Sequence, residues 1–280
     1  MSKEKKKPLS GKTLFITGAS RGIGLEIGKR AAADGANVVV AAKSESENPK
    51  LPGTIYTAAK EIEEAGGVAL AVKCDVRNED EIKAAIEEAV KTFGGIDILV
   101  NNASALSMTS TEKTELKRFR LMHEVNGAGS FFMAKHAIPH LRKAANPHIL
   151  TMSPPLSQMS GKWLGPQLAY AMSKYSMSMV TMGLAAELTP DGIAANSLWP
   201  KTLIDTAAVR HLPGGEELVK HARSARIVAD AAYHILTRSA KECTGKFFVD
   251  EDVLREAGIE DLEQYAVVPG SELHADIFLD

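Results

Sequence analysis

The sequence has 280 residues, hydrophobic residues at 45%, two cysteines and a formal net charge of −2 at pH 7. This length suffices for one large α/β domain with a substantial core. The near-neutral charge gives no reason to expect nucleic acid as a partner. No apolar run approaches the ~20 residues of a membrane helix, so we expect no membrane span. Cys74 and Cys243 are isolated, so we expect neither a disulfide framework nor a metal site.

We recognise no targeting signal at either end of the sequence. Residues 1–10 are basic and no apolar stretch follows them, which predicts a flexible tail and no secretory signal. The last residues, Ile277 to Asp280, contain no peroxisomal or retention tripeptide. With two unpaired cysteines, this predicts a protein of the cytoplasm.

Short apolar runs alternate with helical patterns along most of the chain. The runs that predict buried strands are 12–16, 36–42, 68–73, 96–101, 148–152, 193–199 and 245–249, and predicted helices lie after the first run, at 54–66, from 78, at 112–124, 129–143 and 169–188. This alternation predicts parallel strands with right-handed crossovers. We therefore expect an α/β fold with a doubly wound, seven-stranded parallel Rossmann sheet, helices on both faces and a single domain over residues 11–250.

Two stretches interrupt or follow this alternation. Residues 202–225 are predicted to be loop and helix over the carboxyl ends of the strands, where ligands bind in such sheets, and we interpret them as a substrate lid. Residues 251–280 mix acidic and apolar residues. We expect this extension to pack on the domain or on a neighbouring subunit.

A glycine-rich turn connects the first strand to the first helix. It reads Thr17-Gly18-Ala19-Ser20-Arg21-Gly22-Ile23-Gly24, a variant of the dinucleotide fingerprint with one extra residue between the first two glycines. Glycines allow the backbone to approach a pyrophosphate, whose charge the N–H groups of the helix N-terminus meet. An ordinary glycine-rich turn is the alternative. The surrounding strand and helix favour a cofactor site at residues 18–24.

The end of the second strand indicates which dinucleotide binds. An acidic residue there would bind the ribose hydroxyls of NAD, but this sequence has Ala42 followed by Lys43. A cation without a carboxylate favours the 2′-phosphate of NADP(H), which Arg21 also reaches in this interpretation. Asp75, just past the third strand, is predicted to bond the adenine edge. The alternative for Asp75 is an N-cap for the following helix.

Tyr170 and Lys174 lie one helical turn apart on the same helix face. A free tyrosine has a pKa near 10, and a neighbouring ammonium lowers it toward neutrality, so the pair suits proton exchange with a carbonyl or alcohol. Tyr56 and Lys60 repeat the spacing. That copy follows the second strand, away from the expected nicotinamide, and we interpret it as structural.

These motifs, in this order and with Asn101-Asn102-Ala103 between them, resemble the short-chain dehydrogenase/reductase family. The resemblance covers about residues 11–250 and implies that Tyr170 is the proton donor and acceptor, with Lys174 as its partner and as a contact of the cofactor ribose. It further implies that Asn126 steadies a water and a helix kink for proton relay, that Asn102 and Ala103 line the cofactor, and that hydride moves on the pro-S face. A polar helix breaker before Gly127 is the alternative for Asn126. Further matches extend into the tail and resemble a subgroup whose animal members carry a sterol-carrier-like domain; we expect no such domain here.

The sequence departs from the family at two positions. Where the family has its catalytic serine, this chain has Pro154, which offers neither a hydroxyl nor a backbone N–H. Ser153 and Ser157 are the candidates, and we favour Ser153 because it ends the fifth strand beside a Pro-Pro pair. Lys201 replaces a glycine that usually lines the nicotinamide. It either meets an anionic group of the substrate or points into solvent, and we favour solvent.

The sequence therefore predicts an NADP(H)-dependent oxidoreductase that transfers hydride between nicotinamide and a secondary alcohol or carbonyl of an apolar or lipid-like small molecule. The alternative is an NADP(H)-binding, redox-responsive module with weak or lost catalysis, which Pro154 and Lys201 favour. His136 and His140 have a zinc-compatible spacing, but Pro139 separates them and we expect no metal there. Methionines along the Tyr170 helix suit core packing or the interface of a homodimer or homotetramer.

Overall fold

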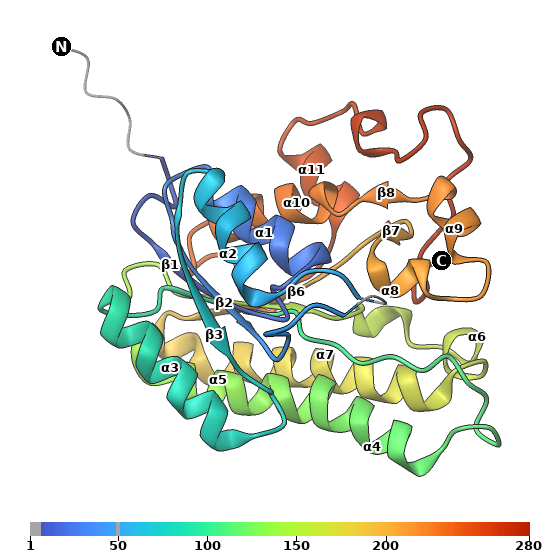
Figure 1. Ribbon diagram of the computed structural model, residues 1–280, viewed down its shortest axis with the longest axis horizontal. Helices are drawn as coiled ribbons and strands as arrows, with labels where there is room; N and C mark the ends of the chain where they lie inside the picture. The colour runs from blue at the N-terminus through green and yellow to red at the C-terminus, as the bar shows by residue number, and fades with distance from the viewer. Residues whose placement is uncertain (1–6, 49–50) are drawn as a thin grey trace.

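The computed structural model describes residues 7–48 and 51–280 (Figure 1). Residues 1–6 of the predicted tail and 49–50 of the loop after the second strand lie outside this description. Seven parallel strands form one sheet in the order β3-β2-β1-β4-β5-β6-β9. Their bounds are β1 (Thr13–Thr17), β2 (Asn37–Ala42), β3 (Val68–Lys73), β4 (Ile98–Asn101), β5 (His148–Met152), β6 (Ala194–Trp199) and β9 (Phe247–Val249). The predicted seven-stranded parallel sheet is confirmed.

Helices cover both faces of the sheet (Figure 1). On one face lie α1 (Gly22–Ala32), α2 (Ile55–Glu64), α10 (Arg226–Leu236) and α11 (Asp250–Glu256); on the other lie α3 (Glu79–Phe93), α4 (Leu116–His123), α5 (Gly129–Leu141) and α7 (Leu168–Leu188). Each face has its own apolar core. Strands β1 and β5 are buried at every position, which explains why they appear in the sequence as continuous apolar runs.

The strand order reverses direction between β1 and β4. Strands β2 and β3 lie on one side of β1, whereas β4, β5, β6 and β9 lie on the other. The loops after β1 and β4 therefore run to opposite faces and leave a crevice at the carboxyl edge of the sheet, which is the usual ligand site of this architecture.

Short elements build the segments beyond the central alternation. Within residues 202–225, β7 (Ile204–Asp205) pairs in parallel with β8 (Arg223–Ser224), and α8 (Ala207–Arg210) and α9 (Gly215–Leu218) lie between them. Helix α6 (Gly161–Leu164) precedes α7, and single 3₁₀ turns occur at Leu156–Gln158, Thr189–Asp191, Val219–His221 and Glu263–Tyr265.

One predicted boundary is wrong. The helices expected at 112–124 and 129–143 form one continuous helix from Leu116 to Leu141, in which α4 and α5 are joined by a π-helical turn, Glu124–Ala128. The interpretation of Asn126 as a helix breaker is therefore also wrong. Gly127 lies where the π turn packs on α7, because a Cβ atom there would lie 2.3 Å from the Ser176 Oγ. The Asn-Gly pair thus marks a close helix contact instead of a helix end.

Packing of the domain begins before residue 11. Leu9 is 3% exposed and belongs to the core under α1. Its backbone N–H donates to the Asp34 carboxylate at 3.2 Å, and the Lys7 ammonium donates to the Ala33 carbonyl at 2.5 Å. Within the predicted N-terminal tail, residues 7–10 therefore contact the domain.

Candidate active site

The glycines of the turn after β1 are required by backbone geometry and close packing. Gly18 and Gly22 have φ values of +66° and +58°, a left-handed conformation that glycine adopts at little cost. A Cβ atom on Gly24 would lie 2.5 Å from the Asn102 Nδ2 atom, and one on Gly18 would lie 2.9 Å from the Ala103 Cα atom. The turn is therefore packed directly against the end of β4.

Asn102 and Thr17 join the two strand ends at the switch point. The Asn102 amide donates to the carbonyl oxygens of Thr17 and Gly18, at 2.9 and 3.2 Å. In return, the Thr17 hydroxyl accepts the backbone N–H groups of Asn102 and Ala103, both at 3.0 Å. These bonds fix the positions of the glycine turn and of residues 102–103 relative to each other.

The N-terminus of α1 is open toward the crevice. Its N-cap residue, Arg21, makes no side-chain capping bond within the described chain, and the first turn, starting Gly22-Ile23-Gly24, contains no acidic residue. The first N–H groups of a helix lack intrahelical partners. An uncapped N-terminus with its positive dipole end is a suitable site for a pyrophosphate.

A cavity of about 380 Å³ lies over this N-terminus, within the range typical of ligand sites. Nine of the predicted cofactor residues line it: Gly18, Ser20, Arg21, Gly22, Ile23, Lys43, Asp75, Asn102 and Ala103. Ala19, Gly24 and Lys174 are not part of the described lining. Ala19 is buried, and Gly24 is the contact point for Asn102. Ser104 and Ala105, which follow the predicted residues, also line the cavity.

The three side chains predicted to select the cofactor have different environments. Arg21 donates to the carbonyl oxygens of Pro52 and Gly53, at 2.9 and 2.6 Å, and so holds the loop that borders the cavity. Lys43 is exposed at the cavity wall. Asp75 accepts a bond from the Arg77 Nε at 2.9 Å, which lowers the pKa of the Asp75 carboxyl.

The N-cap alternative for Asp75 is wrong. Asn78 caps α3, because its Oδ1 atom accepts the backbone N–H groups of Asp80 and Glu81 at 3.0 and 3.3 Å. The Asp75 carboxylate is therefore not used by the helix.

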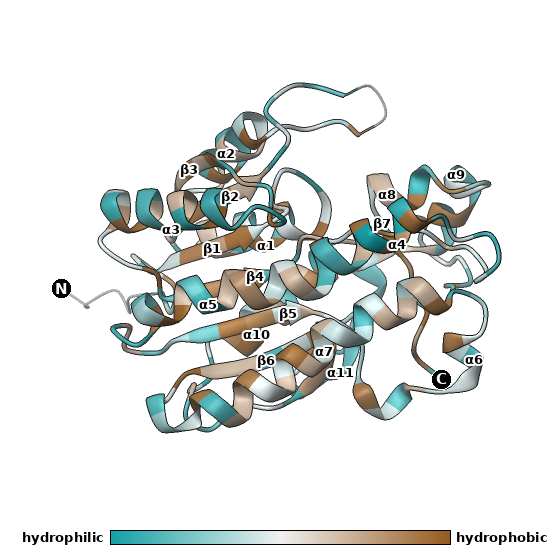
Figure 2. Cartoon of the chain, turned by 90° about the horizontal axis from the view of Figure 1, so that it is seen from below, coloured by the Kyte–Doolittle hydropathy of each residue, from teal (hydrophilic) through white to brown (hydrophobic). Residues whose placement is uncertain are grey.

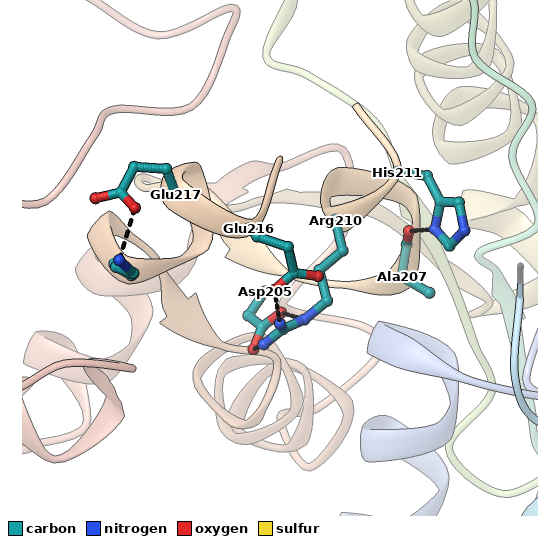
Figure 3. Close-up of polar contacts among 7 residues, drawn as sticks. Asp205, Ala207, Arg210, His211, Glu216 and Glu217 are labelled. Atoms are coloured by element: carbon teal, nitrogen blue, oxygen red, sulfur yellow. Dashed lines mark hydrogen bonds and ion pairs between the residues drawn. The ribbon is translucent and has the colours of Figure 1, made fainter. Parts of the chain in front are cut away.

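Part of the predicted lid covers the cavity. Thr206, Ala207 and Ala208 line the cavity beside the glycine turn. Figure 3 shows how this segment is held: the Arg210 guanidinium binds both carboxylate oxygens of Asp205, at 2.7 and 2.8 Å, and the Glu216 carboxylate at 2.7 Å. The apolar side chain of Ile204, in contrast, belongs to the core.

Tyr170 and Lys174 lie close to each other on α7 and are almost completely buried, with exposed fractions of 7% and 2%. The Lys174 ammonium donates to the Met152 carbonyl at the end of β5, at 2.5 Å. Burial lowers the pKa of Lys174 to about 7, against the opposing charge of Asp276. Burial and then Asp276 raise the pKa of the Tyr170 phenol, while a hydrogen bond with Ser104 lowers it. In the free protein the phenol is therefore protonated.

Asn126 connects the π turn to both the cavity and α7. Its Oδ1 atom accepts the Ala105 N–H at 2.8 Å, and its Nδ2 atom donates to the Ala105 carbonyl at 3.0 Å and the Ser173 hydroxyl at 2.9 Å. The Asn126 carbonyl accepts the Ser130 hydroxyl at 2.7 Å. Asn126 thereby fixes residue 105, which lines the cavity, against the helix that carries Tyr170.

The two candidate serines differ in burial. Ser153 is fully buried, and its hydroxyl has no partner among the described residues. Its carbonyl accepts the Ser197 hydroxyl at 3.0 Å, and the Pro154 carbonyl accepts the Ser178 hydroxyl at 2.7 Å, so neighbouring elements fix the strand end. Ser157 is exposed in the 3₁₀ turn after the two prolines.

The sequence did not predict that the C-terminal strap, which we define as residues 274–280, covers Tyr170. The Phe278 ring is fully buried and stacks on Tyr170, with ring centroids 6.1 Å apart. It also contacts the rings of Trp163, Tyr175 and Trp199. Figure 2 shows the C-terminus beside α6, which precedes the tyrosine helix.

Polar contacts hold the strap in place. The Trp199 Nε1 donates to the Ile277 carbonyl at 2.8 Å, and the Asp276 N–H donates to the Lys201 carbonyl. The Lys201 ammonium, for which we favoured an orientation into solvent, donates to the main-chain oxygen of Asp280 at 3.1 Å in an exposed hydrogen bond. Burial raises the pKa of the Asp276 carboxyl to about 7, and the charges of Asp276 and Lys174 influence each other.

This fold and these motifs define a dehydrogenase of the nicotinamide-dependent kind, and comparison with known proteins places the chain in a family. The family model of short chain dehydrogenases matches residues 12–216, so the chain belongs to the short-chain dehydrogenase/reductase family. Hydroxysteroid dehydrogenase-like protein 2 of Xenopus tropicalis is 54% identical over 272 residues, which are 97% of this chain and 64% of that protein. The human protein of the same name is 52% identical over the same shares. The chain thus spans about 64% of the length of these relatives. The predicted family resemblance is confirmed.

Solved structures agree with this assignment. A protein of Xanthomonas campestris superposes with a TM-score of 0.94 at 55% identity, covering 97% of this chain and 99% of the other. A short chain dehydrogenase of Mycobacterium thermoresistibile has a TM-score of 0.92 at 52% identity, covering 97% and 96%. Within the described ranges, no helix is both long and apolar enough to cross a membrane.

Proposed function

We propose that the chain is an NADP(H)-dependent oxidoreductase that acts on a secondary alcohol or carbonyl. The observation that carries this proposal is the continuity between the cavity and the catalytic pair. The cavity is lined both by the uncapped N-terminus of α1 and by Ser104 and Ala105, of which Ser104 lies beside Tyr170 and Ala105 is bound by Asn126. A dinucleotide whose pyrophosphate lies on α1 would reach the tyrosine with its other end. Bound there, a nicotinamide supplies or accepts the hydride.

The proposed roles follow from the protonation states and contacts of the side chains. Tyr170 holds its proton in the free protein and donates it to the carbonyl oxygen in the reducing direction. Lys174 stabilises the resulting phenolate with its ammonium, and its bond to Met152 fixes its position. Asn126 positions the catalytic helix against the cavity. For the hydroxyl at the end of β5 the sequence prediction is Ser153, which is fully buried and has no side-chain partner within the described chain.

The preference for NADP(H) rests on Lys43. This exposed ammonium lies at the cavity wall with no acidic residue at the end of β2. We expect Lys43→Asp to weaken NADPH binding at least about tenfold, since each tenfold change corresponds to about 1.4 kcal/mol, and to leave NADH binding equal or tighter. Fluorescence titration with each cofactor measures both affinities. The matched control is Lys60→Asp, because Lys60 is exposed on α2 and pairs only with Glu64 among the described residues. If Lys43→Asp binds NADPH and NADH each as tightly as the wild-type protein does, the assignment of NADP(H) through Lys43 is wrong.

We expect Asn126→Ala to lower both stability and turnover. The substitution leaves the buried partners of three side-chain hydrogen bonds unpaired, at a cost of about 1–3 kcal/mol for each group. Urea unfolding should show a loss of at least about 2 kcal/mol. Ser130→Ala, which removes only the bond to the Asn126 carbonyl, is the control and should cost about 1 kcal/mol. If both variants unfold at the same urea concentration, the connecting role of the Asn126 side chain is wrong.

The experiment that tests the proposed function is NADPH oxidation against a panel of ketones, aldehydes and acyl-thioester carbonyls. An apolar or lipid-like substrate is our proposal because the cavity lining includes the apolar side chains of Leu121, Val125, Ala207 and Ala208. Turnover of apolar carbonyls above their polar analogues is the expected result. Tight NADPH binding without turnover of any compound would contradict it.

A homodimer or homotetramer is the proposed assembly. Met172, Met179 and Met182 on α7 are 44–60% exposed, and Phe131 on α5 is 49% exposed. A cluster of exposed apolar side chains on neighbouring helices is typical of a subunit interface. The cytoplasm remains our proposed location, because a reducing compartment suits two cysteines that are both free.

One observation favours the redox-responsive module as a second candidate. Tyr170 and Lys174 are covered by the strap, and Pro154 replaces the family serine. If the strap never moves, the cavity binds the cofactor but no carbonyl reaches the phenol. The substrate panel separates this candidate from the enzyme.

A further inference from the structure

The end of β4 carries a serine that neither the family pattern nor our sequence prediction assigns to the site. Ser104 directly follows Asn101-Asn102-Ala103, is exposed and lines the cavity. Its hydroxyl lies beside the Tyr170 phenol and lowers the pKa of that phenol. Ser104 is therefore accessible from the cavity and in contact with the proposed proton donor at the same time.

The neighbouring backbone fixes Ser104 in this position. The next residue, Ala105, has both its N–H and its carbonyl bound by the Asn126 side chain, at 2.8 and 3.0 Å. On the other side, the Ala103 N–H is bound by the Thr17 hydroxyl at 3.0 Å. A side chain held between two fixed residues satisfies the positional demand on a catalytic hydroxyl.

The end of β5 offers no comparable group. Pro154 has no hydroxyl, Ser153 is fully buried and Ser157 is exposed beyond the prolines. A catalytic hydroxyl has to touch both the phenol and a ligand in the cavity. Ser104 has both contacts available in the free protein.

We infer that Ser104 is a catalytic residue that binds the substrate oxygen together with Tyr170, so that β4 supplies the hydroxyl that β5 lacks. This inference rests on the proposed oxidoreductase function. In the reducing direction the Ser104 hydroxyl donates a hydrogen bond to the carbonyl oxygen and the Tyr170 phenol transfers its proton to that oxygen. Ser104 keeps its own proton throughout.

The test compares Ser104→Ala, Ser153→Ala, Tyr170→Phe and the surface control Ser157→Ala on one carbonyl substrate with NADPH. We expect Ser104→Ala to lower kcat about a hundredfold, the typical effect of removing one donor to a developing oxyanion. Ser153→Ala should lower kcat less than about tenfold, and Ser104→Thr, which keeps the hydroxyl, should recover most of the loss. NADPH affinity, titrated by fluorescence, should stay within about twofold of wild type in Ser104→Ala, because Ser104 contacts the substrate oxygen and the loss lies in kcat.

A second readout separates catalysis from mere structure. Because the bond from Ser104 lowers the phenol pKa, Ser104→Ala should shift the rising limb of alcohol oxidation, which needs the phenolate, to higher pH. The inference is overturned if Ser104→Ala has the kcat and the pH profile of the wild-type protein. It is also overturned if the hundredfold loss in kcat appears in Ser153→Ala and not in Ser104→Ala. If Tyr170→Phe retains activity, or no carbonyl turns over, the proposed function itself fails.

Discussion

Tyr170→Phe should abolish carbonyl reduction, with a loss of at least about a thousandfold in kcat, while NADPH still binds. Positioned proton transfer contributes about 10²–10⁴-fold, and phenylalanine keeps the ring but removes the transferable proton. The ring contact with Phe278, at 6.1 Å, is retained, so the fold should be unaffected. Steady-state kinetics and fluorescence titration with NADPH measure the two effects separately.

The chain contains a matched control for this experiment. Tyr56 and Lys60 have the same spacing on α2, but Tyr56 is 57% exposed and does not line the described cavity. Tyr56→Phe should therefore retain wild-type kcat. Equal activity of Tyr170→Phe and Tyr56→Phe would show that position in the fold does not select the catalytic tyrosine.

Phe278→Ala is expected to destabilise the protein by about 3 kcal/mol, as truncation of a buried phenylalanine usually does. The ring lies among Tyr170, Tyr175, Trp163 and Trp199. Phe278 also has a φ of +69°, the only positive value of a non-glycine residue in the described chain. Alanine relieves none of this backbone strain, since it also has a Cβ atom. Urea unfolding measures the loss.

Hydrogen exchange shows whether the strap is released. The amides of His274 and Asp276 donate to the carbonyls of His221 and Lys201, and both should exchange faster in Phe278→Ala. Val268→Ala is the control: this side chain is 41% exposed, and its loss should cost less than about 0.5 kcal/mol. If Phe278→Ala behaves like this control, the aromatic cluster does not anchor the strap.

The sequence was sufficient for the sheet, because parallel strands buried on both faces appear as largely apolar runs such as 36–42 and 148–152. The glycine turn was visible for a similar reason. Its spacing reflects physical limits at Gly18 and Gly24, where a Cβ atom would meet the end of β4. The nine predicted cofactor residues that line the cavity were therefore predictable from local pattern plus strand order.

Other parts of the site depend on contacts that no local pattern records. A π turn bonds residues five apart instead of four apart, a difference that the sequence pattern does not show. Residues 112–143 were therefore predicted as two helices separated at the Asn-Gly pair. Phe278 and Asp276 lie about a hundred residues beyond Tyr170, and only tertiary packing brings them together. Ser104 lies in a polar loop where one serine resembles any other, and its contact with Tyr170 depends on the path of the chain after β4.

Transfer of deuterium from the pro-S position of C4-labelled NADPH tests the central claim most directly. The protein is incubated with the labelled cofactor and apolar carbonyl compounds, and the products are analysed by mass spectrometry. Our account predicts an alcohol with one deuterium on the carbinol carbon, and its absence in Tyr170→Phe. Tight binding of the labelled cofactor with no deuterium in any product would contradict the account and favour the redox-responsive module.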